Sequence, residues 1–194
     1  MNNTDVPRKV FLFSGHMVDA PDRLQPRFPP DKESLAAAAI AESLNRMGTG
    51  THDLAICGAA CGGDLLFAEA ALMRGARLAF YIPFDEPTFL QNSIEWAGDD
   101  WRRRYFLAKP HAKLHVMPDL LGTDATHDNP YVQLNLWMLG AAMRFGPERL
   151  EFISLWNGEG GDGPGGTFHL MQEVQKAGGR AHWLDTTKLW EVSR

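Results

Sequence analysis

Residues 150–174 read LEFISLWNGEGGDGPGGTFHLMQEV, and this stretch indicates the fold class. An apolar, strand-like run ends at Trp156, a glycine-rich turn follows, and a helix-like pattern begins at Thr167. Residues 54–75, LAICGAACGGDLLFAEAALMRG, have the same order of strand, glycines and helix. Because the strands of a parallel sheet run the same way, both turns should emerge at its carboxyl edge, where such folds bind ligands.

Short, continuous apolar runs recur along the chain. Such runs, rather than strict alternation, are typical of strands that are covered on both faces. The predicted strands are residues 9–14, 54–57, 78–84, 113–117, 150–156 and 181–185. The first predicted helix begins at an Asp31 N-cap and ends before Gly48. The other predicted helices lie at residues 64–74, within 86–108, at 130–145 and at 167–177. This alternation predicts an α/β, doubly wound, mostly parallel sheet in three α/β/α layers.

The composition sets limits on the class of protein. The 194 residues suit one domain over 1–194, and 44% hydrophobic and 22% charged residues are typical of a globular chain. The net charge of -5 argues against nucleic acid as a partner. The most apolar helical segment is shorter than the roughly 18 residues that would span a bilayer, so no membrane partner is expected. Two cysteines, Cys57 and Cys61, fit a reducing cytoplasm.

Glycines that precede a helix let an anion approach the unpaired amides of its first turn. Gly62, Gly63, Gly165, Gly166 and Thr167 are therefore candidate phosphate-binding residues. Neither turn is a Walker A loop or a clean G-x-G-x-x-G sequence, which argues against P-loop phosphoryl transfer. Glycines between a strand and a helix can also serve only a tight turn, and this alternative stays open.

A third polar turn follows the first predicted strand. It places Ser14, Gly15 and His16 at the same edge of the sheet, although His16 could equally be a loop histidine with an internal partner. Asn135, on the helix at 130–145, is either a pocket residue or a buried amide with a partner. No spacing of histidines, cysteines and acids predicts a metal site, and no cofactor is expected.

Four segments together carry a resemblance to a known family. They are LFSGHMVDAPDRLQPRFP (12–29), GAACGGDLLFAEAALMRGA (58–76), IPFDEPTFLQNSI (82–94) and GDGPGGT (161–167). The chain resembles the SLOG superfamily, which joins the Smf/DprA and LOG ("lonely guy", lysine-decarboxylase-like) domains. It is similar in particular to bacterial SLOG domains that are fused to tetratricopeptide repeats or nucleotide cyclases. The resemblance implies a Rossmann-like fold with a nucleotide or nucleotide-derived ligand between the glycine loops.

The resemblance also implies roles for individual residues. Gly165, Gly166 and Thr167 match the phosphate-binding turn of the family, and Asp64 is the carboxylate beside the earlier glycine loop. The complete set of predicted ligand-binding residues is Ser14, Gly15, His16, Gly58, Gly62, Gly63, Asp64, Asn135, Gly163, Gly165, Gly166 and Thr167.

One departure from the LOG enzymes bears on activity. Those enzymes carry P-G-G-x-G-T-x-x-E, whereas the residue three positions after Thr167 is Leu170, and the first acid of this helix is Glu173. The leading hypothesis is therefore a module that binds or senses a nucleotide. The alternative is an N-glycosidase that cleaves nucleoside monophosphates, with Asp64 and Glu173 as catalytic candidates. A third hypothesis is a protein-interaction module with a vestigial pocket, and a homo-oligomer is possible under each.

Overall fold

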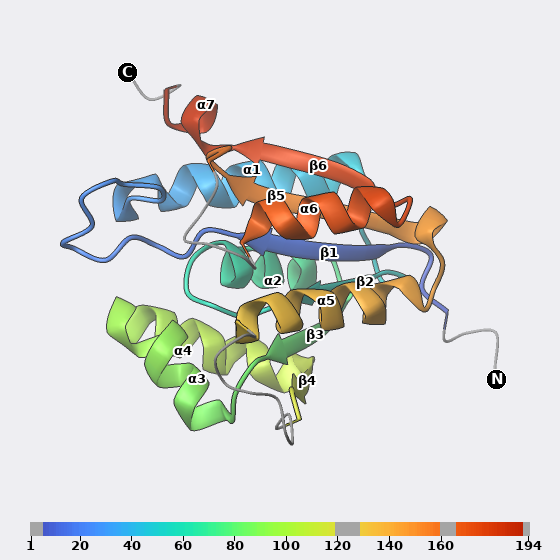
Figure 1. Ribbon diagram of the computed structural model, residues 1–194, viewed down its shortest axis with the longest axis horizontal. Helices are drawn as coiled ribbons and strands as arrows, with labels where there is room; N and C mark the ends of the chain where they lie inside the picture. The colour runs from blue at the N-terminus through green and yellow to red at the C-terminus, as the bar shows by residue number, and fades with distance from the viewer. Residues whose placement is uncertain (1–5, 119–128, 160–165, 192–194) are drawn as a thin grey trace.

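The computed structural model describes residues 6–118, 129–159 and 166–191. Within these ranges a six-stranded sheet has the order β4-β3-β2-β1-β5-β6, and every neighbouring pair is parallel (Figure 1). The strands are β1 Val10–Gly15, β2 Leu54–Cys57, β3 Arg77–Ile82, β4 Ala112–Val116, β5 Leu150–Trp156 and β6 Arg180–Asp185. The α-helices are α1 Glu33–Arg46, α2 Gly63–Met73, α3 Glu86–Ser93, α4 Asp99–Ala108, α5 Pro130–Met143, α6 Thr167–Lys176 and α7 Thr186–Glu191.

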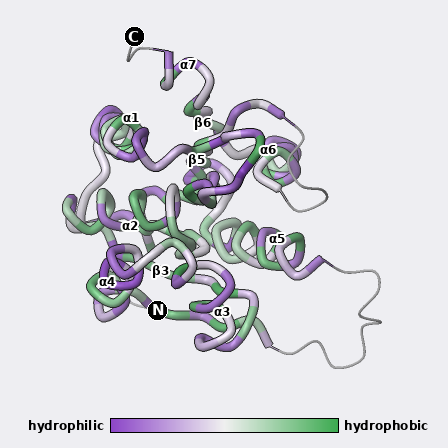
Figure 2. Tube along the Cα trace, turned by 90° about the vertical axis from the view of Figure 1, so that its left-hand side faces the viewer, coloured by the Kyte–Doolittle hydropathy of each residue, from purple (hydrophilic) through white to green (hydrophobic). Residues whose placement is uncertain are grey.

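Helices cover both faces of the sheet. Figure 2 looks onto the edge at which the strands end, with α1, α2 and α4 on one side of the sheet and α5 and α6 on the other. The expected fold class, a Rossmann-like doubly wound sheet in three layers, is confirmed, and the sheet is parallel throughout the described ranges.

The central strand shows why its sequence is continuously apolar. Phe11 and Phe13 pack in the core on the α1 and α2 side, whereas Val10 and Leu12 pack in the core on the α5 and α6 side. All four side chains are fully buried. A strand that is covered on both faces has no polar face, so its pattern does not alternate.

The predicted strands are confirmed to within two residues at each end, and the helices differ more. Asp31 is not the N-cap of α1, because it lies in a short 3-10 turn, Pro30–Lys32, that precedes the helix. Residues 86–108 form two helices, α3 and α4, around a 3-10 turn and Gly98, whose φ is 104°. The short helix α7 has no strong apolar period and was not predicted.

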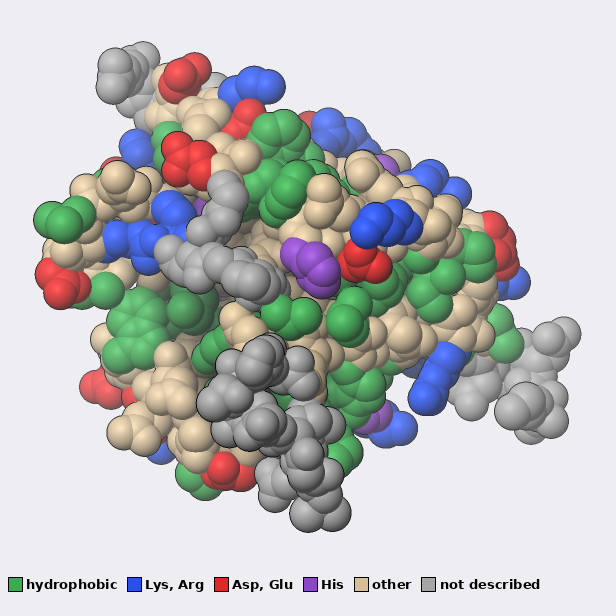
Figure 3. All heavy atoms as spheres, in the orientation of Figure 1, with side chains coloured by type: hydrophobic (Ala, Val, Ile, Leu, Met, Phe, Trp, Pro, Cys, Tyr) green, Lys and Arg blue, Asp and Glu red, His purple; other side chains and the backbone are tan. Residues whose placement is uncertain are grey.

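Helix α5 has no charged side chain over its 14 residues, yet one face of it is exposed. Leu136 is 44% exposed, and hydrophobic side chains gather on the α5 and α6 face in Figure 3. No helix in the described ranges is both long enough and apolar enough to cross a membrane.

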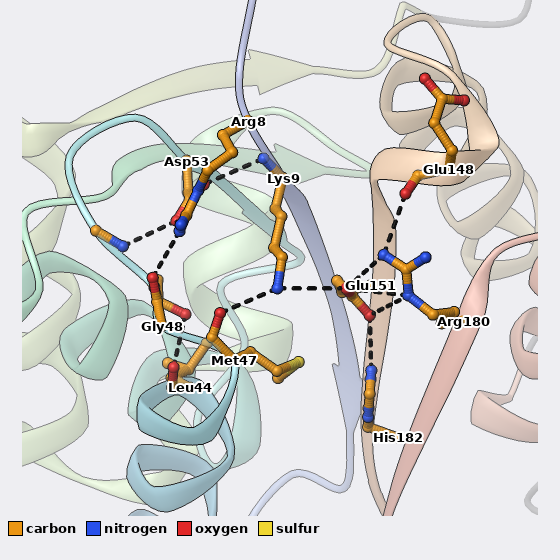
Figure 4. A network of polar contacts seen from close by, with 12 residues as sticks. Arg8, Lys9, Leu44, Met47, Gly48, Asp53, Glu148, Glu151, Arg180 and His182 are labelled. Carbon is orange, nitrogen blue, oxygen red and sulfur yellow. Dashed lines mark hydrogen bonds and ion pairs between the residues drawn. The ribbon is translucent and has the colours of Figure 1, made fainter.

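A buried carboxylate joins the starts of β1 and β2 (Figure 4). Asp53 is fully buried, and its oxygens accept hydrogen bonds from Arg8 Nη2 at 2.6 Å and Arg8 Nε at 3.0 Å. The backbone amides of Lys9 at 3.1 Å and Gly50 at 2.9 Å also donate to it. A buried charge is tolerated only when it is paired and hydrogen-bonded in this way.

A second buried carboxylate joins the starts of β1, β5 and β6. Glu151 is 3% exposed and pairs with Arg180 at 2.6 Å, His182 Nε2 at 2.8 Å and Lys9 Nζ at 3.6 Å. Lys9 also donates to the Met47 carbonyl at the end of α1. The amino ends of four adjacent strands are therefore held together by side chains.

We expect Asp53→Asn to reduce the free energy of unfolding at pH 7 by about 1–3 kcal/mol, because one partner of a buried charged bond is removed. Burial alone raises the pKa of Asp53, but the hydrogen bonds from Arg8 and Gly50 outweigh this effect and lower it. A folded pKa below the unfolded one stabilises the fold above the unfolded pKa, and this contribution is lost as the pH falls through the folded pKa. Urea denaturation should therefore show a smaller difference between the two proteins at pH 3 than at pH 7.

The matched control is Glu42→Gln, which removes an exposed carboxylate that pairs with Arg46 at 3.7 Å. It should change the free energy of unfolding by less than about 0.5 kcal/mol. Equal stability of Asp53→Asn and Glu42→Gln at pH 7 would contradict the assigned role of Asp53.

Candidate ligand-binding site

The strand order reverses direction at β1. The chain moves outward from β1 through β2 and β3 to β4, and then returns to the other side of β1 with β5 and β6. The helices that follow β1 and β5 lie on opposite faces of the sheet (Figure 2). The two loops therefore diverge and leave a crevice at the carboxyl ends of these neighbouring strands.

A cavity of about 650 Å³ occupies this position. Its volume is within the range of small-molecule sites, about 300–1,000 Å³. Among the described residues, those predicted from sequence that line it are Ser14, Gly15, His16, Gly58, Asp64, Asn135, Gly166 and Thr167. Gly62 and Gly63 are described but do not line it, and Gly163 and Gly165 lie outside the described residues.

One end of the cavity is formed by β1 and the start of α6. Ser14 Oγ lies 3.1 Å from Thr167 Oγ1, so the two hydroxyls are hydrogen-bonded across the loops. Gly166 is the N-cap of α6 and has no side chain that could cap the first amides of the helix. As at the start of any α-helix, those amides have no intrahelical acceptor.

The loop after β1 brings Arg27 to the cavity wall. The loop is closed by Asp19, whose Oδ2 accepts hydrogen bonds from the amides of Arg27 and Phe28, each at 2.8 Å. The Asp19 amide in turn donates to the Phe28 carbonyl at 2.8 Å. Basic side chains gather over this loop at the left of Figure 3.

His16 joins the loops that follow β1 and β5. Its Nε2 lies 3.2 Å from both the backbone nitrogen and Oδ1 of Asn157, so either tautomer links the two loops. Burial and then the charge of Arg27 lower the pKa of His16 to about 4, against the opposing hydrogen bond with Asn157. The imidazole is therefore neutral at pH 7, and Arg27 supplies the positive charge.

Asp64 lies in the first turn of α2, and its side chain lines the cavity. Burial raises the pKa of Asp64 to about 7, although hydrogen bonds from the amides of Ala60 and Gly58 lower it. The Ala60 amide donates to Asp64 Oδ2 at 3.2 Å. A Cβ on Gly58 would lie 2.9 Å from the same oxygen, so this glycine makes room for the carboxylate.

Gly62 and Gly63 contact the protein backbone. The Gly63 amide donates to the His16 carbonyl at 3.0 Å, and Met17 forms an antiparallel bridge with Gly62. A Cβ on Gly62 would lie 2.6 Å from the Val18 nitrogen, and the residue has a φ of 109°. These glycines therefore allow the backbone of the loop after β1 to pack closely against the start of α2.

The two remaining predicted side chains lie in different places. Asn135 is 7% exposed and lines the cavity from α5. Glu173 is on α6 but does not line the cavity, and it pairs with Lys176 at 2.7 Å. Leu170, which stands where the LOG enzymes have glutamate, is fully buried in the core.

The sequence prediction missed several residues that line the cavity. They come from the loop after β1, from α3, from the end of β5 and from α6: Met17, Arg27, Phe89, Ser93, Trp156, Phe168, His169 and Gln172. Among these residues, Arg27 matters most for the kind of ligand, because its guanidinium adds a positive charge to the cavity wall. Asp19, eight positions earlier, was the available signal, since an acid can close such a loop.

The described residues hold no cluster of three or more histidines, cysteines or acids that could bind a metal ion. No protein-family model matches the chain, and a comparison with curated proteins finds no match. Among solved structures, the fold is similar to the X-ray structure of DNA processing protein A (DprA) from Streptococcus pneumoniae, with a TM-score of 0.41 and 15% identity. The match covers 95% of this chain and 62% of that protein, and nothing about ligands follows from it.

We expect Gly62→Ala to destabilise the fold by more than about 1 kcal/mol, because an alanine there meets the Val18 backbone in a conformation that only glycine adopts readily. Gly140→Ala is the control, since Gly140 is inside α5 with nothing within 4 Å of an added Cβ. It should stabilise by about 0.5–1 kcal/mol. Both changes are measured by urea denaturation, and wild-type stability of Gly62→Ala would rule out the packing role.

Proposed function

We propose that the chain is a SLOG-type module that binds and senses a nucleotide or nucleotide-derived ligand. The observation that carries the proposal is the cavity at the strand-order reversal, with the hydroxyls of Ser14 and Thr167, the start of α6 and Arg27 in its wall. These groups suit a phosphate. The proposal treats residues 1–194 as one domain that acts on a small molecule in the cytoplasm and not on nucleic acid.

The phosphate end is supported by charge and by hydrogen bonding. A helix N-terminus carries a partial positive charge and unpaired amides, which favour an anion. Thr167 is the first residue of α6, and its hydroxyl is within hydrogen-bond distance of Ser14. Arg27 adds a guanidinium, which can contact two phosphate oxygens at once.

The rest of the cavity suits a nucleoside. Leu134 and Met138 line it from α5, and Phe89 lines it from α3. Tyr131, at the start of α5, is 43% exposed and meets Phe84 edge to face at 6.1 Å. Aromatic and apolar side chains of this kind provide surfaces against which a planar base can pack. The sequence resemblance to SLOG domains supports the same class of ligand.

The binding proposal predicts that AMP or GMP raises the melting temperature, while adenosine, guanosine and inorganic phosphate do much less. At 100 times its dissociation constant, a ligand adds about 2.7 kcal/mol to the free energy of unfolding. Thr167→Val and Arg27→Met should each weaken this stabilisation, because each removes a proposed phosphate contact. Thermal denaturation with and without nucleotide measures the effect.

Arg46→Met is the control for Arg27→Met, because Arg46 is an exposed arginine on α1 that pairs only with Glu42 in the described part of the chain. It should leave the ligand-induced shift unchanged. A shift that survives both Thr167→Val and Arg27→Met would place the binding site elsewhere.

One observation favours the alternative, hydrolysis of the N-glycosidic bond. Asp64 lines the cavity and has a pKa near 7, which suits general acid or base catalysis. Glu173, the other catalytic candidate, pairs with Lys176 away from the cavity. A positive charge that develops on the ribose must meet a carboxylate nearby, and Leu170 cannot provide one.

We therefore expect binding without release of free base when the protein is incubated with AMP or GMP and the products are separated by chromatography. The control is the same incubation without protein. Many turnovers of free base per protein, lost in Asp64→Asn, would replace the sensing proposal with the glycosidase.

A further inference from the structure

The buried carboxylates of the described chain have different partners. Asp19, Asp53 and Glu151 are buried, and each pairs with an arginine. The pairs are Asp19–Arg23 at 3.4 Å, Asp53–Arg8 at 2.6 Å and Glu151–Arg180 at 2.6 Å. A charge that is removed from water needs such a partner. These three carboxylates therefore have their compensation within the protein.

Asp64 is a partly exposed carboxylate, and its partners differ from those of the other three. Within the described residues it accepts hydrogen bonds from backbone amides, those of Ala60 and Gly58, and forms no ion pair. The side chain opens onto the cavity, in contrast to the three carboxylates above. The carboxylate of Asp64 can therefore accept further hydrogen bonds from a ligand in the cavity.

We infer that Asp64 is the residue that recognises the nucleoside part of the ligand, by accepting hydrogen bonds from two adjacent donors on it. The inference rests on the proposed function, because it takes the phosphate to lie at Ser14 and Thr167. Helices α2 and α6 lie on opposite faces of the sheet (Figure 2). The first residue of each contacts the carboxyl end of β1, Gly63 through the His16 carbonyl and Thr167 through the Ser14 hydroxyl. A ligand held by its phosphate at α6 therefore extends toward Asp64.

Two parts of a nucleotide offer adjacent donors to a carboxylate. One is the pair of hydroxyls on the ribose, and the other is the ring N–H and the amino group of guanine. Either pair matches the two oxygens of a carboxylate, which accepts in a bidentate manner. The absence of a side chain at Gly58 leaves space beside this carboxylate, because a Cβ there would lie 2.9 Å from Asp64 Oδ2. The inference predicts weak binding of ligands that lack both donor pairs.

The same arrangement makes recognition depend on pH. Burial is the cause that raises the pKa of Asp64 to about 7, and no charged side chain contributes to it. The ionisable groups beside Asp64 are the thiols of Cys57 and Cys61, whose pKa values are raised by burial and by Asp64 itself. His16, Arg27 and His169 are the other ionisable side chains that line the cavity, and none of them shifts Asp64.

Donors on the ligand favour the carboxylate over the neutral acid, so the ionised form of Asp64 is the binding form. With a pKa near 7, the ionised fraction rises about tenfold between pH 6 and pH 8. The phosphate of the ligand also ionises near pH 6, and it does so with any variant of the protein. The ratio of wild-type to variant affinity therefore isolates the contribution of Asp64.

The experiment is calorimetric titration of wild type, Asp64→Asn and Asp64→Ala with AMP, GMP and the 2′,3′-dideoxy form of each, at pH 6 and pH 8. We expect wild type to bind at least tenfold more tightly than either variant at pH 8, and this ratio to fall about tenfold at pH 6. If the ribose is recognised, both dideoxy nucleotides lose the advantage of wild type. If guanine is recognised, wild type binds dideoxy-GMP more tightly than the variants do, whereas wild type and variants bind AMP equally.

Circular dichroism and thermal denaturation show whether each variant is folded, and Asp64→Ala, which suits a helix, serves if Asp64→Asn does not fold. Equal affinity of wild type and folded variants at both pH values would overturn the role of Asp64 and leave the proposed nucleotide site standing. Absence of binding of AMP and GMP to wild type would overturn the proposed function, and the inference with it.

Discussion

The arrangement of the molecule depends on how the central strand β1 is fixed at both of its ends. At its start, Lys9 reaches the buried Glu151 of β5, and the amide of the same residue reaches Asp53 beside β2. At its far end, the chain after β1 lies against Gly62 so closely that a Cβ would not fit. Since β1 separates the two halves of the doubly wound sheet, these contacts fix where the halves diverge and so where the cavity lies. The hydrophobic core surrounds the strand but does not by itself set this position.

Much of the fold could be predicted from the sequence, because strands covered on both faces are short continuous apolar runs and glycines end the helices. The local sequence pattern was insufficient where the surrounding structure decides how a helix begins. Asp31 reads as a helix cap, yet the preceding prolines start a 3-10 turn there. At the site, five of the side chains that line the cavity were predicted from the sequence, but most of the lining side chains were not. The sequence could not separate a glycine that faces a ligand from one, such as Gly62, that faces backbone, since both positions require only the absence of Cβ. Arg27 was missed because its place depends on closure of a loop by Asp19, eight residues away.

The electrostatic character of the cavity follows from burial as much as from the residue types. His16 would be partly protonated in water near neutral pH, but burial and its neighbour Arg27 keep it neutral, so the positive charge in this part of the wall is that of the guanidinium. Asp64 would be a full anion in water, and burial brings its pKa close to neutrality. A ligand with one anionic end and one end rich in hydrogen-bond donors matches this distribution in a single orientation.

The contrast between the two edges of the sheet has a consequence for how the protein changes over evolutionary time. The amino ends of β1, β2, β5 and β6 are held by ion pairs of buried carboxylates, whereas the cavity is built from loops and helix starts at the opposite edge. Substitutions of side chains that face the cavity leave the ion pairs intact, whereas a glycine packed against backbone, such as Gly62, tolerates little change. A scaffold of this kind can change its ligand specificity through substitutions of side chains that face the cavity, while the ion pairs at the opposite edge stay in place.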